Sequence, residues 1–201
     1  MALGSIISPL LFLIMINDLP NVPVNIESSM FVDDSAVFKS GKNIKYITEQ
    51  VQKNLGKLEE WCDKWGFKVS MDKTVAVLFC RRVVNNNVIL KFNGNTINTT
   101  NRAKFLGIIF DSKLTWSEHI SYNEGKCKKH LNLMRSVADN TWGACKKSLL
   151  TIYGALIRSI LDYGSVAFDS AFKSTNNRLD SIGRYVLVSV QWWQRLTRRY
   201  S

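Results

Sequence analysis

Apolar residues recur along this chain with two periods, which predict two kinds of element. Between about Asn43 and Trp65 they follow one another at gaps of three and four, the spacing of one face of an α-helix. The apolar positions are Ile44, Ile47, Val51, Leu55, Leu58, Cys62 and Trp65. Gly66 follows, and glycine is the common residue just beyond a helix end. We interpret the stripe as a packing face against a sheet.

A second helix is predicted over residues 8–18. Its apolar run, Leu10 to Ile16, follows Ser8-Pro9, and proline favours the first helical position. The run is too short to span a membrane, and no basic region of an export signal precedes it. We therefore expect a buried core helix, no membrane partner, and an intracellular protein of the nucleus or cytoplasm.

Short apolar runs separated by turn residues predict strands in the rest of the first half. They are Phe67–Ser70 and Val75–Phe79 around Met71–Thr74, Val88–Phe92 and Asn95–Ile97 around Asn93-Gly94, and Lys104–Phe110. Asn-Gly is a strong signal for a type I′ hairpin turn. Residues 1–111 are therefore predicted to be α+β, with helices packed on an antiparallel sheet.

After Asp111 the pattern becomes helical. Thr115–Glu118 fits a capping box that opens a helix. Its apolar face would be Trp116, Ile120, Cys127, Leu131 and Met134, with Lys126, Lys128 and Lys129 on or beside the opposite face. A second helix is predicted from about Ala144 to Tyr163, ended by Gly164. A third begins near Asn176 and carries Leu179, Ile182 and Val186.

Positive charge is concentrated in the second half. The net charge is +11, and residues 1–100 hold 11 Lys and Arg against 9 Asp and Glu, whereas residues 101–201 hold 16 against 7. A basic half joined to a nearly neutral half suggests that one part holds a polyanion. The alternative is a merely solvated surface. Hydrophobic residues at 46% and charged residues at 21% exclude a disordered chain.

The four cysteines indicate neither a disulfide framework nor a metal cluster. They are Cys62, Cys80, Cys127 and Cys145, and none forms a Cys-x-x-Cys pair. We expect them to be reduced, mostly core-facing and without a disulfide partner. Cys127 and His130 have a ligand-like spacing but lack the second pair of a zinc site.

Candidate chemistry centres on Asp33-Asp34, which lies between the apolar runs Ser29–Val32 and Ser35–Phe38. This pattern predicts a β-hairpin with both carboxylates at its tip. Two adjacent negative charges repel, and either turn chemistry or a divalent cation explains them. From these residues alone, the turn is the favoured interpretation.

Several blocks, taken in order, resemble the reverse transcriptases of non-LTR retrotransposons of the jockey-like kind. The blocks are Gly4–Phe12, Ile16–Pro20, Phe31–Asp34, Lys64–Val69 with Asp72–Thr74, Lys104–Ile108 with Asp111, Leu114–Ile120 and Leu161–Gly164. The resemblance covers roughly residues 3–182. It is carried by the order and spacing of the blocks, because each block alone is weak.

The resemblance implies a partial polymerase palm over residues 1–111, an all-α helical thumb over 112–190 and a divergent tail over 191–201. It implies an RNA-directed DNA polymerase that transfers nucleotides with two metal ions. The implied partners are an RNA template and DNA primer, or their RNA–DNA duplex. Deoxynucleoside triphosphates are the implied substrates of the parent enzyme.

The same resemblance implies roles for particular residues. Catalytic roles fall to Asp33, Asp34 and Lys73, nucleotide or template contacts to Gly4, Ser5 and Phe31, and the primer grip to Leu106 and Gly107. Asp33 and Asp34 would bind Mg²⁺ or Mn²⁺, Asp33 most directly, and Lys73 would lie near the triphosphate. A plain strand-end lysine and a plain helix entry are the alternatives for Lys73 and for Gly4-Ser5. We expect Trp116 and His119 to serve packing and capping.

Departures from the family limit what is expected. The family has a further catalytic Asp on a strand upstream of the Gly4-Ser5 block, and neither that strand nor the fingers is matched; Leu3 replaces the usual glutamine. We therefore expect a truncated copy that starts inside the palm, holds metal weakly and is inactive alone.

Three alternatives stay open. The first is a non-catalytic nucleic-acid-binding relic of a retroelement. The second is a viral RNA-dependent RNA polymerase, against which the blocks Lys64–Phe67, Leu106-Gly107 and Leu114–Trp116 argue. The third is a generic α+β protein with an Asp-Asp turn.

Overall fold

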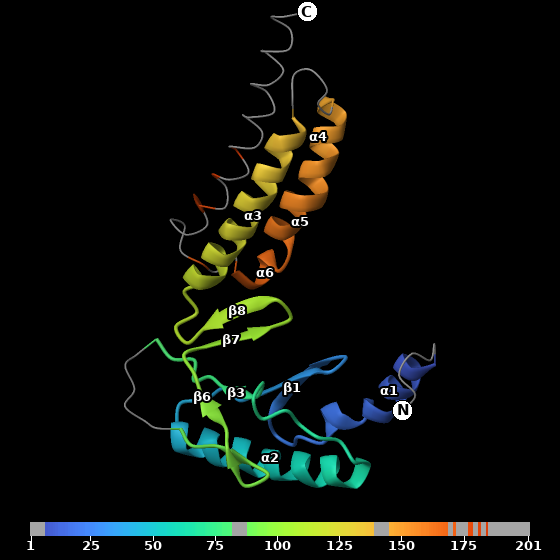
Figure 1. Ribbon diagram of the computed structural model, residues 1–201. Coiled ribbons are helices and arrows are strands. Elements are labelled where there is room, and N and C mark those ends of the chain that lie inside the picture. The colour runs from blue at the N-terminus through green and yellow to red at the C-terminus, as the bar shows by residue number, and fades with distance from the viewer. Residues whose placement is uncertain are drawn as a thin grey trace, which may run out of the picture. The chain divides into compact units, whose positions relative to one another are not determined.

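The computed structural model describes residues 7–81, 88–138 and 145–168, together with the single positions 171, 177, 178, 181 and 184. The chain divides into two compact units, Met1–Gly107 and Ile108–Ser201, and each is described by itself (Figure 1). Among the described residues, no helix combines the length and apolarity needed to cross a bilayer.

The first unit contains two helices, a 3₁₀ turn and seven short strands among its described residues. In chain order they are α1 Ser8–Ile16, η1 Leu19–Asn21, β1 Glu27–Phe31, β2 Asp34–Phe38, α2 Ile44–Trp65, β3 Val75–Ala76, β4 Lys91–Phe92, β5 Asn95–Thr96, β6 Asn98–Thr99 and β7 Arg102–Phe105.

Helix α2 confirms the longest predicted helix and organises the core of this unit. The Asn43 side chain accepts a hydrogen bond from the Tyr46 amide at 3.3 Å, and Gly66 ends the helix at φ 71°. The buried cluster consists of Ile16, Trp61, Cys62, Leu90, Phe92 and Ile97. Trp65, which was expected on the apolar face, is 43% exposed, and Trp61 takes the buried position instead.

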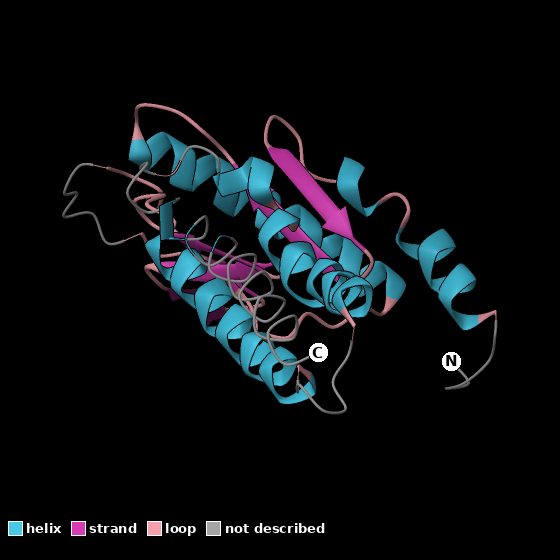
Figure 2. Cartoon of the chain, turned by 90° about the horizontal axis from the view of Figure 1, so that it is seen from above, coloured by secondary structure: helices cyan, strands magenta, loops and turns pink. Residues whose placement is uncertain are grey.

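The strands pair two at a time, so the expected single antiparallel sheet is wrong in detail. β1–β2 and β4–β5 are antiparallel, whereas β3–β6 is parallel. Figure 2 shows the strands in magenta among the cyan helices. Residues 67–70 form no strand, because Phe67 stacks on Trp61 at 5.2 Å and the Ser70 carbonyl accepts from Thr74 in a turn. The Asn93-Gly94 turn is confirmed, with φ of 48° and 73°.

Helix α1 is not the buried core helix that its apolar sequence predicted. Ile16 is its only buried residue, while Leu10, Leu11, Leu13 and Ile14 are between 48% and 65% exposed. Phe12 packs against the buried cluster and meets the Phe67 ring edge-on at 6.2 Å. A helix that is apolar all round needs neighbours on every side, and the described part of this unit supplies them on one side only.

Among its described residues, the second unit contains one strand, β8 Ile108–Asp111, followed by helices. Its helices are α3 Ser117–Val137, α4 Lys146–Tyr153, the π-helical turn η2 Gly154–Arg158, α5 Ser159–Asp162 and α6 Ser165–Phe168. α3 and the run from α4 to α5 confirm the first two predicted helices of this half. The third, from Asn176, is described only at positions 177, 178, 181 and 184, so its apolar residues Leu179, Ile182 and Val186 lie outside the described residues, as does the tail over 191–201.

The core of the second unit confirms the predicted apolar face of α3. Its buried members are Trp116, Ile120, Cys127, Leu131, Met134, Ala138, Leu149, Ile157 and Phe168. The cysteines are free: Cys62 and Cys127 are buried, Cys80 is half-buried and Cys145 is exposed. Burial raises the pKa of the Cys62 and Cys127 thiols, which keeps both neutral at physiological pH.

Asn54 should be a stabilising residue of the first unit. It is 1% exposed, its Oδ1 accepts from the Val24 amide at 2.6 Å, and its Nδ2 donates to the carbonyls of Val24 and Gln50 at 3.1 and 2.8 Å. We predict that Asn54→Ala lowers the free energy of unfolding in urea by about 2 kcal/mol, because the Val24 groups lose their partner. Lys53→Ala on the exposed face is the control; equal effects of both variants would contradict this role.

Two glycines offer a matched test of backbone conformation. Gly94 has φ +73° in the β4–β5 turn, Gly56 lies inside α2, and a Cβ at either position meets nothing within 4 Å. We predict that Gly94→Ala lowers the free energy of unfolding by about 1 kcal/mol and that Gly56→Ala raises it by about 0.5–1 kcal/mol. Urea denaturation measures both, and shifts of the same sign would refute the assignment of strain to φ.

Candidate functional site

The Asp33-Asp34 hairpin forms as predicted, with one difference at its tip. β1 pairs with β2 in a register that places Phe31 opposite Asp34 and Glu27 opposite Phe38. The loop therefore consists of Val32 and Asp33 alone. Asp33 lies in the turn, whereas Asp34 is the first residue of β2, one position past the tip; both are exposed.

Val32 carries backbone strain that the sequence did not reveal. Its φ is 54°, a region that a β-branched residue rarely adopts. A positive φ at the first turn position is the pattern of a type II′ turn, where glycine is usual. Such a conformation costs on the order of 1–3 kcal/mol, and strain of this kind clusters at functional sites. Valine within a run of strand-forming residues gives no turn signal.

The two faces of this hairpin differ in exposure. Ser28 and Met30 lie on the inner face: the Ser28 hydroxyl donates to the Pro20 carbonyl at 2.8 Å, and Met30 packs against the buried cluster. Residues directly opposite each other in an antiparallel pair share a face. Asp34 therefore shares the outer face with Phe31, which is 61% exposed. An exposed aromatic ring and a carboxylate thus stand side by side.

The donor set of this hairpin fits a divalent cation in ligand type but is small. Two carboxylates offer the hard oxygen atoms that Mg²⁺ prefers, and both are open to solvent. Across the described ranges, no group of three or more His, Cys, Asp or Glu side chains is placed to hold a metal. Asp33 and Asp34 could therefore hold a cation mainly through water, with weak affinity.

The remaining residues assigned to nucleotide chemistry are not joined to this pair. Gly4 and Ser5 lie outside the described residues. Lys73 is exposed in the turn after Ser70, whose carbonyl accepts from the Lys73 amide at 3.3 Å. In the part of the chain that the structure describes, no ion pair links Lys73 to either carboxylate.

Leu106 and Gly107 occupy a hairpin turn, not the interior of a strand. The single strand predicted over Lys104–Phe110 is wrong: β7 and β8 pair with each other, and the two residues between them have φ of 47° and 79°. Two positive φ values match a type I′ turn, for which Asn-Gly is the usual signal. Leu-Gly inside an apolar run gave no such signal.

The entry to α3 differs from the predicted capping box. Thr115 was expected to cap the helix, but the N-cap is Trp116, at φ 63° and without a side-chain cap. Asp111 holds this entry instead: its Oδ2 accepts from the Thr115 amide at 2.9 Å and hydroxyl at 3.0 Å, and its Oδ1 from the Trp116 amide at 2.8 Å. Partial burial opposes ionisation of Asp111, but these hydrogen bonds prevail and lower its pKa.

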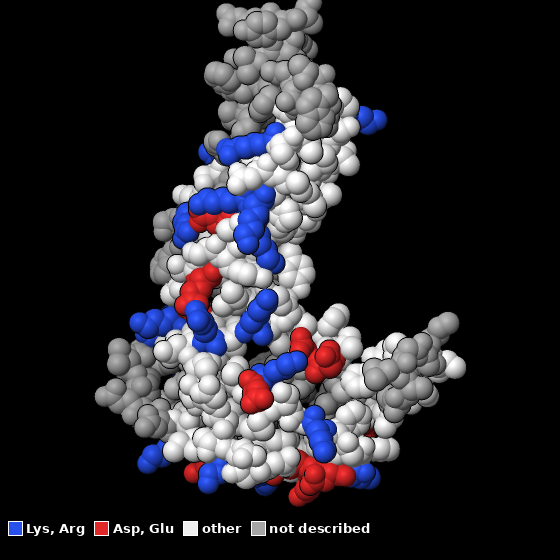
Figure 3. Space-filling view, viewed as in Figure 1, with Lys and Arg blue, Asp and Glu red and all other residues white. Residues whose placement is uncertain are grey.

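Exposed cations follow α3 and the helices beside it, and Figure 3 shows lysine and arginine side chains gathered over this unit. The described, exposed ones are Lys113, Lys126, Lys128, Lys129, Arg135, Lys147, Arg158, Arg178 and Arg184. Lys126 and Lys129 are both exposed on α3, and the Lys126 ammonium lies 4.4 Å from the centre of the Tyr122 ring. A cation beside an aromatic ring is a pairing suited to nucleic acid.

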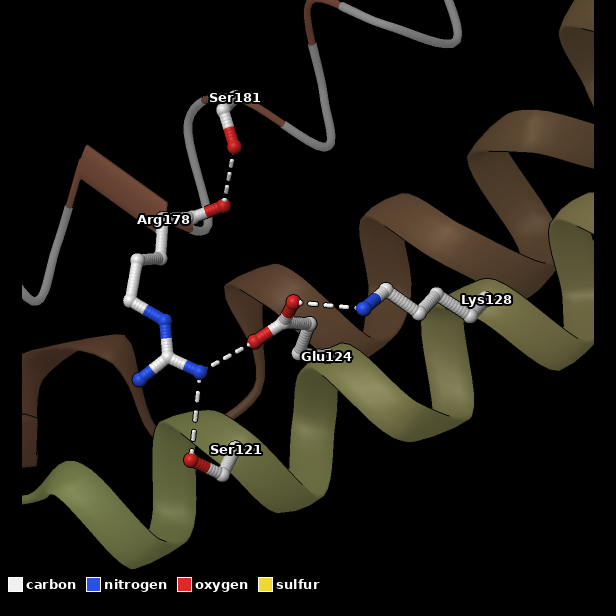
Figure 4. A network of polar contacts seen from close by, with 5 residues as sticks. All are labelled: Ser121, Glu124, Lys128, Arg178 and Ser181. Atoms are coloured by element: carbon white, nitrogen blue, oxygen red, sulfur yellow. Dashed lines mark hydrogen bonds and ion pairs between the residues drawn. The ribbon is translucent and has the colours of Figure 1, made fainter.

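One acidic side chain neutralises part of this surface. Glu124 pairs with Lys128 at 2.8 Å and with Arg178, which also donates to the Ser121 hydroxyl at 3.3 Å (Figure 4). The hydrogen bonds from Lys128 and Arg178 lower the pKa of Glu124. Lys126 and Lys129 form no ion pair within the described residues.

Comparison with known proteins identifies the family. Residues 1–110 match the family described as "Reverse transcriptase (RNA-dependent DNA polymerase)". The chain is 26% identical over 208 residues to an RNA-directed DNA polymerase from mobile element jockey of Drosophila melanogaster, covering 96% of this chain and 22% of that protein. It is 25% identical over 184 residues to a probable RNA-directed DNA polymerase from transposon BS of the same species, covering 88% and 20%.

A third relative comes from another insect. The chain is 26% identical over 185 residues to a retrovirus-related Pol polyprotein from type-1 retrotransposable element R1 4 of Nasonia vitripennis, covering 83% of this chain and 47% of that protein. The chain thus spans about a fifth to a half of the length of these relatives. No solved structure is significantly similar to it. The match over more than half of the chain, with relatives from non-LTR retrotransposons, shows that the protein belongs to the reverse transcriptase family.

Proposed function

We propose that this chain carries the metal-binding hairpin and part of the nucleic-acid surface of an RNA-directed DNA polymerase. The observation that supports this most is the exposed Asp33-Asp34 pair at a strained two-residue turn. Members of the family generally use divalent metals. In this proposal, residues 1–111 belong to the palm and residues 112–190 to the thumb.

Each part of the hairpin has a task in this proposal. Asp33 and Asp34 would hold the cation, and the chemistry it would supply when bound is activation of the 3′-oxygen of the primer and stabilisation of the leaving pyrophosphate. Phe31 offers an exposed ring on the same face as Asp34, suited to stacking on a base or sugar. Lys73 would approach the triphosphate of an incoming nucleotide, which Gly4 and Ser5 would also contact.

The second unit supplies the contact with template and primer in this proposal. Lysine and arginine side chains neutralise phosphates and release counterions, which gives affinity without sequence preference. The Leu106-Gly107 turn, which belongs to the first unit and where Gly107 is exposed, would contact the primer as well. A close backbone approach is possible there because glycine has no side chain.

A second candidate function is nucleic-acid binding without catalysis. The excess of positive charge over residues 101–201 favours it independently of the carboxylates, as do the exposed Lys126 and Lys129, which form no ion pair within the described residues. The two candidates differ in their dependence on metal, because phosphate contacts by lysine do not need Mg²⁺.

Metal binding at the hairpin is the first test. We predict that Mn²⁺ selectively broadens the NMR signals of residues 32–35 and that chelation by EDTA restores them. Asp33→Asn should weaken the apparent affinity about tenfold or more, because one carboxylate charge close to the cation is lost. Glu27→Gln is the control, an exposed acid at the far end of the same hairpin. Equal broadening in Asp33→Asn and the wild type would refute the assignment.

Primer extension on an RNA template tests catalysis. We predict that the 201-residue chain shows no measurable extension with Mg²⁺ or Mn²⁺, and that Asp33→Ala is indistinguishable from it, because two carboxylates alone hold metal weakly. Extension that disappears in Asp33→Ala would contradict the predicted inactivity, while supporting the catalytic role of Asp33.

Salt dependence tests the nucleic-acid surface. We predict that Lys126→Ala/Lys129→Ala reduces the slope of log Kobs against log salt concentration, for an RNA–DNA duplex, by about 2, since two phosphate contacts are lost. The control is Lys42→Ala/Lys45→Ala, an exposed pair with the same spacing in the first unit. Equal slopes in both variants would exclude this face of α3. Binding that is unchanged by EDTA would favour the non-catalytic candidate.

A further inference from the structure

His119 lies at the centre of the contacts that hold β8 to the helices of its unit. It is 1% exposed, and its Nδ1 accepts a hydrogen bond from the Ile109 amide at 3.3 Å. Its Nε2 lies 3.1 Å from the amide group of Asn123, and its ring centre lies 5.1 Å from that of Phe168. Because Nδ1 accepts, the neutral ring carries its proton on Nε2. The Asn123 atom at 3.1 Å from Nε2 is placed as Nδ2, a donor, so the amide has to be turned over for its Oδ1 to accept the Nε2 proton.

This arrangement requires a neutral ring. A protonated imidazole has a donor at both nitrogens, so it cannot accept from the Ile109 amide. Burial lowers the pKa of His119, and the positive charge of Lys126 on the same helix lowers it further. The ring is therefore neutral at pH 7, and the Ile109 hydrogen bond is intact there.

Other residues of β8 are held by the same unit. Phe110 lies 5.3 Å from the Trp116 ring, at an interplanar angle of 60°, and Asp111 accepts three hydrogen bonds at the entry of α3. Ile108 approaches Gly164 so closely that a Cβ there would lie 2.7 Å from its Cδ1. Gly164 also has φ +69°, so only glycine fits this position without strain.

A hairpin of two four-residue strands needs such support. Two-stranded hairpins are at best marginally stable in water, and the β7–β8 turn contains Leu106 at a positive φ. Contacts from α3 and from Gly164 fix β8 from its first residue to its last. Because Ile108 follows Gly107 directly, fixing β8 also fixes the end of the turn.

We propose that His119, Asp111 and Gly164 form a clamp on β8, and that His119 is a positioning residue for the contact of the Leu106-Gly107 turn with primer–template duplex. The clamp itself rests on the contacts described above. The role in duplex binding rests on the function proposed for the turn.

Hydrogen exchange of the Ile109 amide tests the clamp in the full chain. We expect its protection factor to fall at least about tenfold as the pH is lowered from 7.5 through the depressed pKa of His119, because the ring becomes charged and one hydrogen bond is lost. The Leu131 amide in the core of α3 is the internal reference. His119→Gln can still accept from Ile109, so it should keep most of the protection at pH 7.5 and lose the dependence on pH. His130→Gln, at the other histidine of the chain, should behave as the wild type.

Two outcomes would overturn the clamp. One is an Ile109 protection factor that does not change with pH in the wild type, and the other is the same dependence in His119→Gln. Gly164→Ala gives a second probe, and it should lower the protection of Ile109 at pH 7.5 because the new Cβ meets Ile108. Gly154→Ala, where a Cβ meets nothing within 4 Å, is its control, and equal effects of the two variants would also count against the clamp.

Duplex affinity tests the positioning role separately. We expect the affinity for a duplex with a recessed primer end to fall about tenfold in His119→Leu and to be restored in His119→Gln. In the wild type, this affinity should fall with decreasing pH in parallel with the protection of the Ile109 amide. An affinity that ignores His119 while Ile109 protection follows it would refute the positioning role and the function proposed for the turn, but not the clamp. If neither the duplex affinity nor the protection of the Ile109 amide depends on His119, the whole inference is refuted.

Discussion

The structure depends on side chains that form hydrogen bonds with backbone groups, as neighbouring strands do in a larger sheet. Its described strands are two to five residues long and pair only two at a time, so many backbone groups need partners from elsewhere. Gln52 of α2 supplies both for Lys91, accepting from its amide at 2.8 Å and donating to its carbonyl at 2.9 Å. Asn54, two residues further along α2, does the same for Val24. In the second unit, His119 and Asp111 play this part for β8 and the entry of α3.

This dependence explains which parts of the fold the sequence could predict. Helix α2 was predicted because a period of 3.6 is repeated over 22 residues and a glycine follows its end. Two-residue strands such as β3 and β6 carry no periodic signal. The burial of helix α1 was predicted wrongly, because an apolar sequence indicates that a helix needs packing partners but does not identify them. The Asn93-Gly94 turn succeeded because its chemistry is local.

The candidate site was predictable only in part, for the same reason. Asp33 and Asp34 were found through their own pattern and through the resemblance of the surrounding blocks. The partnership of His119 with Ile109 was not, because it joins a strand to a helix across ten residues with no common period. The strained residues Val32 and Leu106 were also missed, and each lies in a turn assigned to the site. Residue preferences for turns do not predict a turn whose residues are suited to another role than turn formation, and such strained turns are concentrated at functional sites.

Because Asp33 and Asp34 are exposed, the stability of their hairpin does not depend on metal binding. Water screens the repulsion between exposed carboxylates, so the hairpin does not need a cation in order to fold. The inner face of the hairpin, with Ser28 and Met30, contributes the contacts that hold it in place. Loss of the metal site would therefore leave the fold and the basic surface of α3 unchanged. A chain of this design can lose catalysis and keep nucleic-acid binding, and metal dependence is consequently the property that distinguishes the two candidate functions.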